Sequence, residues 1–462
     1  MKDKDYYLLL PVEVSRRELL AKLYVGLKGV RRGYRVIIGE HARPIFMRYS
    51  TGFLLYKDHA PWSKERMIRF KRKGLHVGCL DEEGLIYKSE HIYITTRCSS
   101  DVLCSLDAVF LWGNNQRDIM KGLLRDNKFF CVGNPRLDIL NRLRAKDSRT
   151  SDYNKILINT RFPSCNGFRG DAELNNLRKL KIVSNDEEHK EYLEFVRVDK
   201  VIFDGFLDLI RKLSQGGQYR ITIRPHPGEN MSVYSDIAID KDNVIIDNDA
   251  ELVDQINAND IIIHDGCTTA IEASAAGKIV LGFRPSGANL NYGQFANRFS
   301  KNFDDIEKLS RYIENISSEK HHHEIDDEEA QYFISNWPLR GSNASDCILD
   351  VVDQFRVLST QKVNNPGPIL SGLGGDGLKY WCHLLLMRTR FRPIFRKIFG
   401  ARFNEYYKNV QMNEHKFPPL TEGKVLEAID FLCSLDDSLG AVQDYRVVMI
   451  GKKAFLLTDD NA

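Results

Sequence analysis

The stretch RITIRPHPGEN at residues 220–230, followed by DIIIHDGCTTAIEASAAGK at residues 260–278, decides the fold of this chain. Ile221–Ile223 is a short apolar run, and Pro225 and Pro227 stop a strand from continuing past it, so a buried strand that ends in a loop is predicted. The second stretch begins with another buried strand and continues into an alanine-rich segment that predicts a helix. This alternation is typical of an α/β protein with a parallel sheet.

Polar side chains follow both predicted strands. His226 lies on the loop after the first strand, and Thr268, Thr269 and Glu272 lie where the helix begins after the second. Free N–H groups at a helix start favour phosphate, and ligands of open α/β sheets bind at the carboxyl ends of strands. Each residue alone could be a helix cap, a solvated carboxylate or a loop histidine, but the ordered pair of motifs predicts a site for a phosphorylated ligand.

Length and composition narrow the class of protein. The chain has 462 residues, 43% hydrophobic and 28% charged, which predicts a globular protein of two or three domains. A net charge of +3 argues against a dedicated nucleic-acid binder. The nine cysteines form no C-x-x-C pair, and no segment reads as a signal peptide or a membrane span, so we expect a cytoplasmic protein with reduced thiols.

The amino-terminal half begins with a β-α-β pattern. Tyr6–Val12 and Tyr34–Gly39 predict strands, and Arg17–Arg32 predicts the helix between them. Neither G-x-G-x-x-G nor G-x-x-x-x-G-K-[ST] occurs, so NAD and P-loop chemistry are not expected.

A polar segment at residues 144–153 predicts a linker between two α/β domains, residues 1–150 and 151–345. The second domain opens with the strand KILIN at residues 155–159. Arg161, just past this strand, is either a ligand for a phosphate or carboxylate or a surface arginine. We expect the ligand to bind between the domains.

An acidic turn, Asp81-Glu82-Glu83-Gly84, follows the strand predicted at Leu75–Leu80. Carboxylates this close repel one another, which raises the pKa of at least one and makes a base or nucleophile plausible, although a solvated turn is the commoner explanation. The nearby loop Lys57-Asp58-His59 could hold an anionic sugar or simply be exposed.

We expect no metal site. The D-x-D motifs at residues 240–242 and 247–249 lie in acidic sequence rich in turn-forming residues. The three histidines at residues 321–323 would point in different directions on a helix.

Residues 346–462 predict a helical tail. Within it, residues 380–403 mix aromatic and apolar side chains with arginines and lysines, a pattern that suits a helix lying on an anionic membrane surface. A helical cap on the main domains would have a similar sequence, and Pro393 would interrupt one long helix.

These motifs together resemble a family of bacterial glycosyltransferases. Residues 224–227 resemble the "HP" motif of sialyltransferases, polysialyltransferases and Kdo transferases, residues 264–272 resemble their Ser/Thr motif, and residues 81–84 resemble their acidic D/E-D/E-G motif. LLPVEVSRRELLAKL at residues 9–23 and CLDEEGL at residues 79–85 resemble the bacterial surface carbohydrate biosynthesis group more specifically. The resemblance covers roughly residues 6–340.

The resemblance implies a GT-B enzyme with two Rossmann-like domains, the acceptor on the amino-terminal side, a CMP-sugar donor and no essential metal or other cofactor. His226 would contact the donor phosphate, Thr268 and Thr269 would bind phosphate at the helix start, and Glu272 would hold ribose hydroxyls. The donor site implied in full comprises Arg161, Arg224, His226, Pro227, Asp265, Thr268, Thr269 and Glu272.

For catalysis, the resemblance places Glu82 where inverting members keep their general base. Retaining members use a carboxylate as nucleophile, and Asp81, Glu82, Glu83 and Asp265 all stay open for that role. We expect transfer of a 2-keto sugar acid (pseudaminic, legionaminic, sialic acid or Kdo) with retention, to a glycan or lipid-linked glycan acceptor of a capsule or O-antigen, at the inner face of the cytoplasmic membrane. The alternatives are a teichoic-acid type CDP-glycerol or CDP-ribitol phosphotransferase and a non-catalytic capsule-assembly protein.

Overall fold

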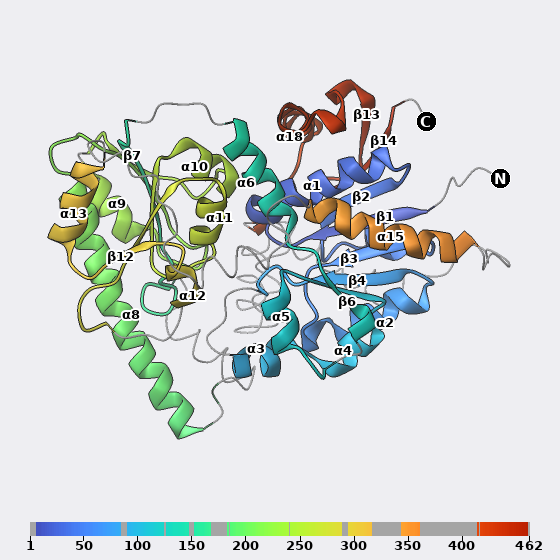
Figure 1. Ribbon diagram of the computed structural model, residues 1–462, viewed down its shortest axis with the longest axis horizontal. Helices are drawn as coiled ribbons and strands as arrows, with labels where there is room; N and C mark the ends of the chain where they lie inside the picture. The colour runs from blue at the N-terminus through green and yellow to red at the C-terminus, as the bar shows by residue number, and fades with distance from the viewer. Residues whose placement is uncertain are drawn as a thin grey trace, which may run out of the picture.

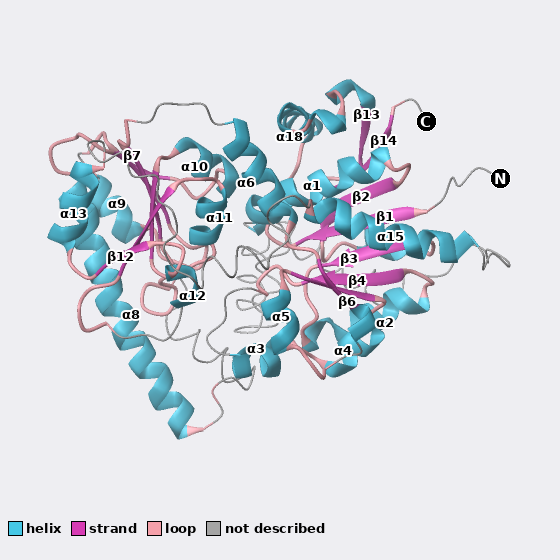
Figure 2. Cartoon of the chain, viewed as in Figure 1, coloured by secondary structure: helices cyan, strands magenta, loops and turns pink. Residues whose placement is uncertain are grey.

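The computed structural model describes residues 6–84, 90–123, 126–146, 152–167, 183, 185–239, 241–288, 294–316, 343–360, 414 and 416–460. These residues form two α/β domains that lie side by side (Figure 1). Each domain is built around a sheet whose faces are covered by helices (Figure 2). The expected fold class, α/β with two Rossmann-like domains built on largely parallel sheets, is confirmed.

The first sheet has the strand order β13-β14-β2-β1-β3-β4-β5-β6 within the described residues. Its parallel strands are β1 (Tyr7–Val12), β2 (Arg35–Glu40), β3 (Gly52–Tyr56), β4 (His76–Leu80), β5 (Ala108–Leu111) and β6 (Phe129–Cys131). These strands are nearly continuous apolar runs because helices bury both faces of a parallel sheet. The connection from β2 to β3 passes over β1, so the strand order reverses between β1 and β3.

Two strands from the far end of the chain complete this sheet. β13 (Tyr445–Met449) and β14 (Ala454–Asp459) form an antiparallel hairpin, and β14 pairs antiparallel with β2, with Ala454 opposite Gly39. A Cβ atom at residue 39 would lie 2.5 Å from the Cβ of Ala454, so only glycine permits this approach. The expectation that residues 346–462 are helical is therefore corrected: the described part also contributes a hairpin, whose short strands the sequence pattern did not reveal.

The second sheet has the order β12-β11-β10-β7-β8-β9, and all its pairs are parallel. Its strands are β7 (Lys155–Asn159), β8 (Arg220–Arg224), β9 (Val244–Ile246), β10 (Ile261–His264), β11 (Ile279–Phe283) and β12 (Lys301–Phe303). The two strands predicted from residues 221–223 and 260–264 are thus present, and the order reverses between β7 and β10.

Helices cover both sheets (Figure 1). Those of the first domain are α1 (Ser15–Arg31), α2 (Lys64–Arg72), α3 (Glu90–Arg97), α4 (Ser100–Ser105), α5 (Asn114–Ile119), α6 (Pro135–Lys146), α15 (Ala344–Thr360) and α18 (Glu422–Leu435). Those of the second are α8 (Asp186–Leu213), α9 (Ser232–Ala238), α10 (Leu252–Ala258), α11 (Thr269–Ala275), α12 (Gln294–Asn297) and α13 (Ile306–Asn315).

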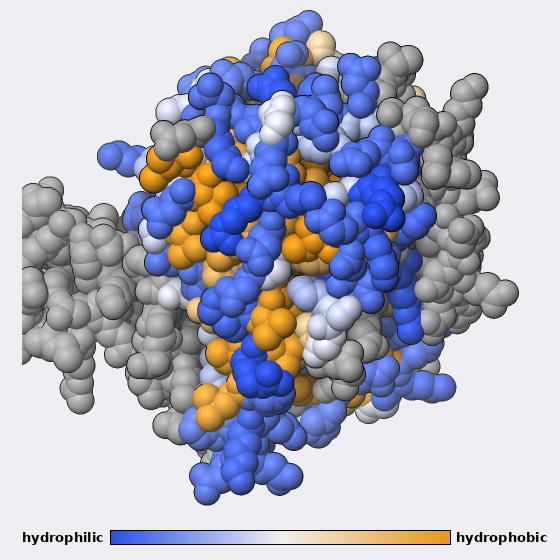
Figure 3. Space-filling view, turned by 90° about the vertical axis from the view of Figure 1, so that its left-hand side faces the viewer, coloured by the Kyte–Doolittle hydropathy of each residue, from blue (hydrophilic) through white to orange (hydrophobic). Residues whose placement is uncertain are grey.

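Helix α8 begins earlier than its apolar pattern indicates. Its buried apolar residues begin at Val198, but Asn185 already caps the helix by accepting a hydrogen bond from the Glu188 N–H, and acidic residues fill the first turn. Its first half extends away from the domain (Figure 1). The face that carries this domain is mainly hydrophilic with smaller apolar areas (Figure 3), and Leu193 and Val201 of α8 are among the exposed apolar side chains.

One hydrophobic cluster continues from the first domain into the second. It includes Leu23 of α1, Leu140 of α6, Ile256 of α10 and Ala270 of α11, all buried. Helix α6 packs against α1 on one side and α11 on the other. The two domains therefore share a packed interface around α6.

Two of the sequence predictions fall outside the described residues: the basic, aromatic segment at 380–403 and the histidines at 321–323. In the part of the chain that is described, no helix is both long and apolar enough to cross a lipid bilayer.

We predict that Leu457→Ala in β14 lowers the free energy of unfolding by about 2–5 kcal/mol, because this side chain is fully buried in the hydrophobic core of the first domain. Urea denaturation measures this change. Val448→Ala on β13, where the side chain is 40% exposed, is the control and should cost less than about 1 kcal/mol. Equal effects of the two substitutions would contradict a structural role for the hairpin in the first domain.

Candidate functional site

The candidate site lies where the carboxyl ends of the strands in both sheets meet the domain interface. In the second sheet, β7 and β10 are neighbours at the point where the strand order reverses. Loops after such strands form the usual ligand site of a doubly wound sheet. The loop after β7 contains Arg161, the loop after β10 contains Asp265 and Thr268, and the loop after neighbouring β8 contains His226.

Glu229 organises the His226 loop. Its buried carboxylate accepts hydrogen bonds from the His226 N–H at 3.0 Å, the Phe162 N–H at 3.1 Å, the Thr160 hydroxyl at 2.9 Å and the Tyr234 hydroxyl at 2.5 Å. Burial raises the pKa of Glu229 although these donors oppose the change. One carboxylate thus joins the loops after β7 and β8.

The His226 ring is exposed, as is Pro227 beside it. Its Nδ1 accepts the Gly228 N–H at 3.1 Å, so in the neutral ring the proton lies on Nε2. Surrounding protein atoms reduce the hydration of the ring, and this effect, with the charge of Arg17 from the first domain, lowers the pKa of His226 to about 4. His226 is therefore neutral at pH 7 and can donate one hydrogen bond from Nε2.

Helix α11 begins at the domain interface. Thr268 stands at its cap position, partly exposed, with no side-chain capping hydrogen bond, while Thr269 is buried. The carboxamide of Asn159 after β7 donates to the Cys267 sulfur at 3.3 Å, which draws the two loops together. The Thr268 hydroxyl thus stays available for a ligand.

Arg161 and Asp265 form an internal ion-pair network. The Arg161 guanidinium pairs with Asp265 and, at 3.0 Å, with Asp199, and its Nε donates to the Asp265 carbonyl at 2.6 Å. Arg284 pairs with Asp265 at 2.5 Å. Arg161 is thus a buried residue that links loops, which corrects the alternative of a surface arginine, and Asp265 is fully enclosed by its two arginines.

Asp81 of the acidic turn is also enclosed. It has no exposed surface, pairs with Arg97 of α3 at 2.5 Å and accepts the Tyr93 hydroxyl at 3.1 Å. Burial alone would raise the pKa of Asp81, but the Arg97 charge outweighs it and the pKa falls to about 2. The expected repulsion is thus not what sets the pKa of this carboxyl, because an arginine neutralises it.

Glu82 is buried beside two cations of the first domain. Its carboxylate lies 3.0 Å from the Lys22 Nζ of α1 and 3.8 Å from the Arg136 Nε of α6. Burial disfavours its charged form, yet Lys22 and then Arg136 outweigh this and lower the pKa of Glu82 below its ordinary value. Glu82 is therefore ionised at neutral pH.

Glu83 is the exposed member of the turn. Its side chain is 52% exposed, 3.0 Å from Arg97 and 3.6 Å from Arg17. Its charge also acts on His226 across the interface. The acidic turn and the His226 loop thus both lie at the domain interface, close enough for their charges to interact.

Arg136 joins the two domains directly. Its guanidinium forms an ion pair with Glu272 of α11, donates to the Glu82 carbonyl at 3.2 Å and lies over the Trp112 ring with its centroid at 5.1 Å. Both partners of the ion pair are almost fully buried, and among the described residues the Glu272 Oε2 has no hydrogen-bond partner. Glu272 thus keeps one acceptor oxygen for a hydroxyl.

Arg224, at the end of β8, donates from Nη1 to the Ala250 carbonyl at 2.8 Å and to the Gln255 Oε1 at 2.5 Å. Burial lowers the pKa of Arg224, and Glu272 is among the nearby charges that act on it. Arg224 therefore fixes the loop after β9.

The remaining polar motifs have structural surroundings. Asp249 pairs with Arg16 of the first domain, and the Asp247 carboxylate accepts the Asp249 and Ala250 N–H groups. No group of three His, Cys, Asp or Glu side chains in the described ranges could hold a metal ion. Asp58 and His59 are buried, so the loop at residues 57–59 is not simply exposed.

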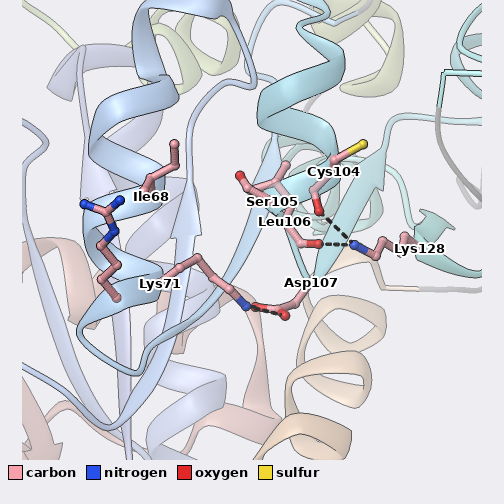
Figure 4. Close-up of a pocket in the computed structure, with 8 residues that line it drawn as sticks. Ile68, Lys71, Cys104, Ser105, Leu106, Asp107 and Lys128 are labelled. Atoms are coloured by element: carbon pink, nitrogen blue, oxygen red, sulfur yellow. Dashed lines mark hydrogen bonds and ion pairs between the residues drawn. The ribbon is translucent and has the colours of Figure 1, made fainter.

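A separate surface depression of about 400 Å³ lies at the amino ends of β4, β5 and β6, away from these motifs. Lys71 pairs there with Asp107 at 2.6 Å, and Lys128 donates to the carbonyl oxygens of Leu106 and Cys104 (Figure 4). Its main cations are thus occupied by partners within the protein.

Sequence reasoning assigned no role to Lys22, Arg97, Trp112, Arg136 or Glu229. Two of these residues stand in or near recognisable motifs. Arg136 is the last residue of the motif Gly133-Asn134-Pro135-Arg136, and Glu229 follows His226 by three residues. Nothing in the sequence indicated that Lys22 and Arg97 would pair with the acidic turn, because those contacts depend on the tertiary fold.

No protein-family description matches the chain, and no curated protein matches it in sequence. Solved structures with a similar arrangement include the wall teichoic acid polymerase TagF, at 12% identity over 78% of this chain and 90% of that one, with a TM-score of 0.46. A UDP-bound MnaA of S. aureus is 13% identical over 79% of this chain and all of that one, with the same TM-score. A UDP-N-acetylglucosamine 2-epimerase has a TM-score of 0.45 at 11% identity, over 80% of this chain and all of that one.

We predict strong coupling between Arg136 and Glu272 in a double-mutant cycle. Arg136→Met and Glu272→Gln should each lower the free energy of unfolding by about 3–5 kcal/mol, because each leaves a buried partner uncompensated. The double variant should lose less than the sum of the two, by about 1 kcal/mol or more in urea unfolding. The exposed pair Glu194 and Arg197 on α8 is the control, with coupling below about 1 kcal/mol. Additive effects at Arg136 and Glu272 would exclude a strong ion pair.

We also predict that stability rises with pH between about pH 4 and 6.5. Burial lowers the pKa of His264, which is fully buried, to about 4, so the unfolded chain binds more protons than the folded one in this window. His264→Gln should reduce the slope of unfolding free energy against pH by up to about 1.4 kcal/mol per pH unit. Urea denaturation from pH 4.5 to 7.5 measures it, and an unchanged slope would contradict a neutral buried His264.

Proposed function

We propose that this protein is a glycosyltransferase that moves a 2-keto sugar acid from a CMP-activated donor to a surface-glycan acceptor. The observation that supports this most is that the His226 loop and the acidic turn both lie at the domain interface, where Arg17 is 3.6 Å from Glu83 and both charges act on the imidazole. A donor group and a reacting carboxylate need this relative placement. The sugar acid would be a pseudaminic, legionaminic, sialic or Kdo residue, the acids that the motif resemblance implies.

His226 would assist departure of CMP. The bond to the anomeric carbon breaks through an oxocarbenium-like state, and CMP leaves as a phosphate monoester that gains negative charge. The Nε2 proton of His226 can donate to a phosphate oxygen, because Nδ1 already accepts the Gly228 N–H. Thr268, at the open start of α11, would supply a hydroxyl to the same phosphate.

Glu82 would supply the reacting carboxylate. Lys22 and Arg136 keep it ionised, as a base or nucleophile must be before reaction. If Glu82 acts as a base and takes the proton of the acceptor hydroxyl, the configuration at the anomeric carbon is inverted. If Glu82 instead attacks the anomeric carbon and displaces CMP, a covalent intermediate forms, and its reaction with the acceptor hydroxyl gives net retention. Retention is the course we propose, and Glu83, which is more exposed, is the second candidate for the role.

Glu272 would bind the ribose of the nucleotide. Its Oε1 is held by Arg136, and its Oε2 has no partner among the described residues, so a ribose hydroxyl can complete its hydrogen bonding. We propose no metal for this chemistry, since a neutral histidine and hydroxyl donors serve the phosphate. The proposed place of action is the inner face of the cytoplasmic membrane.

A CDP-glycerol or CDP-ribitol phosphotransferase is the second candidate enzyme, because a histidine beside a nucleotide phosphate serves both reactions. A non-catalytic capsule-assembly protein would bind nucleotide without turnover. The ionised Glu82 close to the interface favours the sugar-acid reaction, which needs a carboxylate at the anomeric carbon or acceptor.

A titration panel of CMP, CDP, UDP and GDP tests the proposal with wild type, His226→Gln and the control His189→Gln on α8. We expect wild type and control to prefer CMP. His226→Gln should bind CMP about tenfold more weakly, because the hydrogen bond from the imidazole to the charged phosphate is lost. With a CMP-sugar acid and an acceptor panel, Glu82→Gln should lower kcat at least 100-fold. A preference for CDP would support the phosphotransferase, a preference for UDP would refute the motif assignment, and CMP-sugar binding without turnover would support the assembly protein.

A further inference from the structure

Cationic side chains gather where the strand order of the first sheet reverses. Glu13 follows β1 and Lys57 follows β3, the two strands at the reversal, and the Glu13 carboxylate pairs with both Lys57 and Lys416. Lys416 comes from the returning C-terminal segment, and its carbonyl accepts the Ser15 hydroxyl at 3.3 Å. This segment thus brings a lysine to the start of α1.

Arg17 lies in the first turn of α1, two residues after Ser15, whose hydroxyl contacts the lysine-bearing segment. Its Nη2 is 3.2 Å from Glu18 and 3.6 Å from Glu83, and its buried Nε has no hydrogen-bond partner within the described residues. Burial opposes the charge of Arg17, but Glu18, Glu83 and Glu82 outweigh it and raise the pKa of Arg17. Arg17 is therefore a lasting cation with one N–H group that no described residue uses.

The start of α1 touches the second domain beside the His226 loop. Arg16 donates to the Asn248 carbonyl in the loop after β9, and the Arg224 guanidinium of β8 donates to Ala250 in the same loop. The charges of both Arg17 and Lys416 act on His226. Two cations of the first domain therefore accompany the histidine of the second.

We propose that Arg17 and Lys416 form a subsite for a second anionic group of the donor, adjacent to the phosphate that His226 would contact. This inference rests on the proposed function and extends it. Both side chains are about one-quarter exposed, at 26% and 27%, so an anion can reach them while they stay anchored by carboxylates. An arginine with an unused N–H and a lysine on a flexible stem are the usual ligands of carboxylate and phosphate.

The ligand chemistry is an anion pair a few bonds apart. In a CMP-sugar acid the second anion is the sugar carboxylate, and in a CDP-polyol it is the second phosphate. CMP itself has no second anionic group. Arg17 and Lys416 would therefore distinguish a complete donor from the nucleotide product, which lacks the group they bind.

The test is a calorimetric titration of five probes against the full chain: inorganic phosphate, pyrophosphate, CMP, CMP-N-acetylneuraminic acid and CDP-glycerol. Arg17→Gln and Lys416→Gln should each weaken pyrophosphate and one of the two complete donors by about tenfold, and CMP by less than threefold. Arg17→Lys and Lys416→Arg should restore most of the lost affinity because they keep the charge. Arg211→Gln on α8 and Lys424→Gln on α18 are matched controls and should change nothing.

The titrations with different probes distinguish the anion subsite from the proposed function. Loss of CMP-N-acetylneuraminic acid binding identifies the carboxylate as the second anion, and loss of CDP-glycerol binding identifies a phosphate. If pyrophosphate binding depends on Arg17 and Lys416 while no cytidine nucleotide binds wild type, the subsite stands and the proposed function falls. Equal weakening of CMP and the complete donors, unchanged binding in both variants, or no binding of any probe by wild type overturns the subsite.

Discussion

The buried guanidinium of Arg136 is the interaction on which the arrangement of the two domains depends. It lies on the helix that packs against both domains, and it binds one acceptor from each side, the Glu272 carboxylate by an ion pair and the Glu82 backbone carbonyl by a hydrogen bond. Removing such a charge from water is costly unless each neighbour is well placed. The interface therefore has a defined geometry at this point, and the acidic turn and helix α11 hold fixed positions relative to one another.

The two sheets have different strand orders, and this difference explains how the site is divided. The second sheet reverses between β7 and β10, and the loops there are filled by the Arg161 and Asp265 ion pairs. The first sheet reverses between β1 and β3, where charged side chains have more contact with solvent. Buried ion pairs therefore shape the interface loops of the second domain, while the facing loops of the first domain keep accessible charges.

Much of the second domain could be predicted from local sequence. Ile221–Ile223 and residues 260–264 are strands because continuous apolar runs ended by proline or glycine leave few other choices. The same local reasoning placed His226 and the acidic turn at strand ends. It could not predict that Arg97 neutralises Asp81 or that Lys22 pairs with Glu82, because these partners are distant in sequence and only the packed fold brings them together.

The hairpin was missed for a related reason. Its strands are five and six residues long, and their pairing with β2 depends on the absence of a side chain at Gly39, far away in the chain. Single-segment patterns carry no information on such a partner. The helical reading of the tail was correct for α18 and incomplete for the strands that follow it.

The place of β14 has a consequence for synthesis of the protein. As the ribosome produces the chain, all strands of the second sheet emerge before the strand that borders β2, so the second domain can complete its sheet while one edge of the first is still open. An open edge exposes unpaired backbone groups and invites association with other chains. The nascent protein thus has an interval in which the edge of β2 lacks its neighbour, and this interval ends when β14 has left the ribosomal tunnel and pairs with β2.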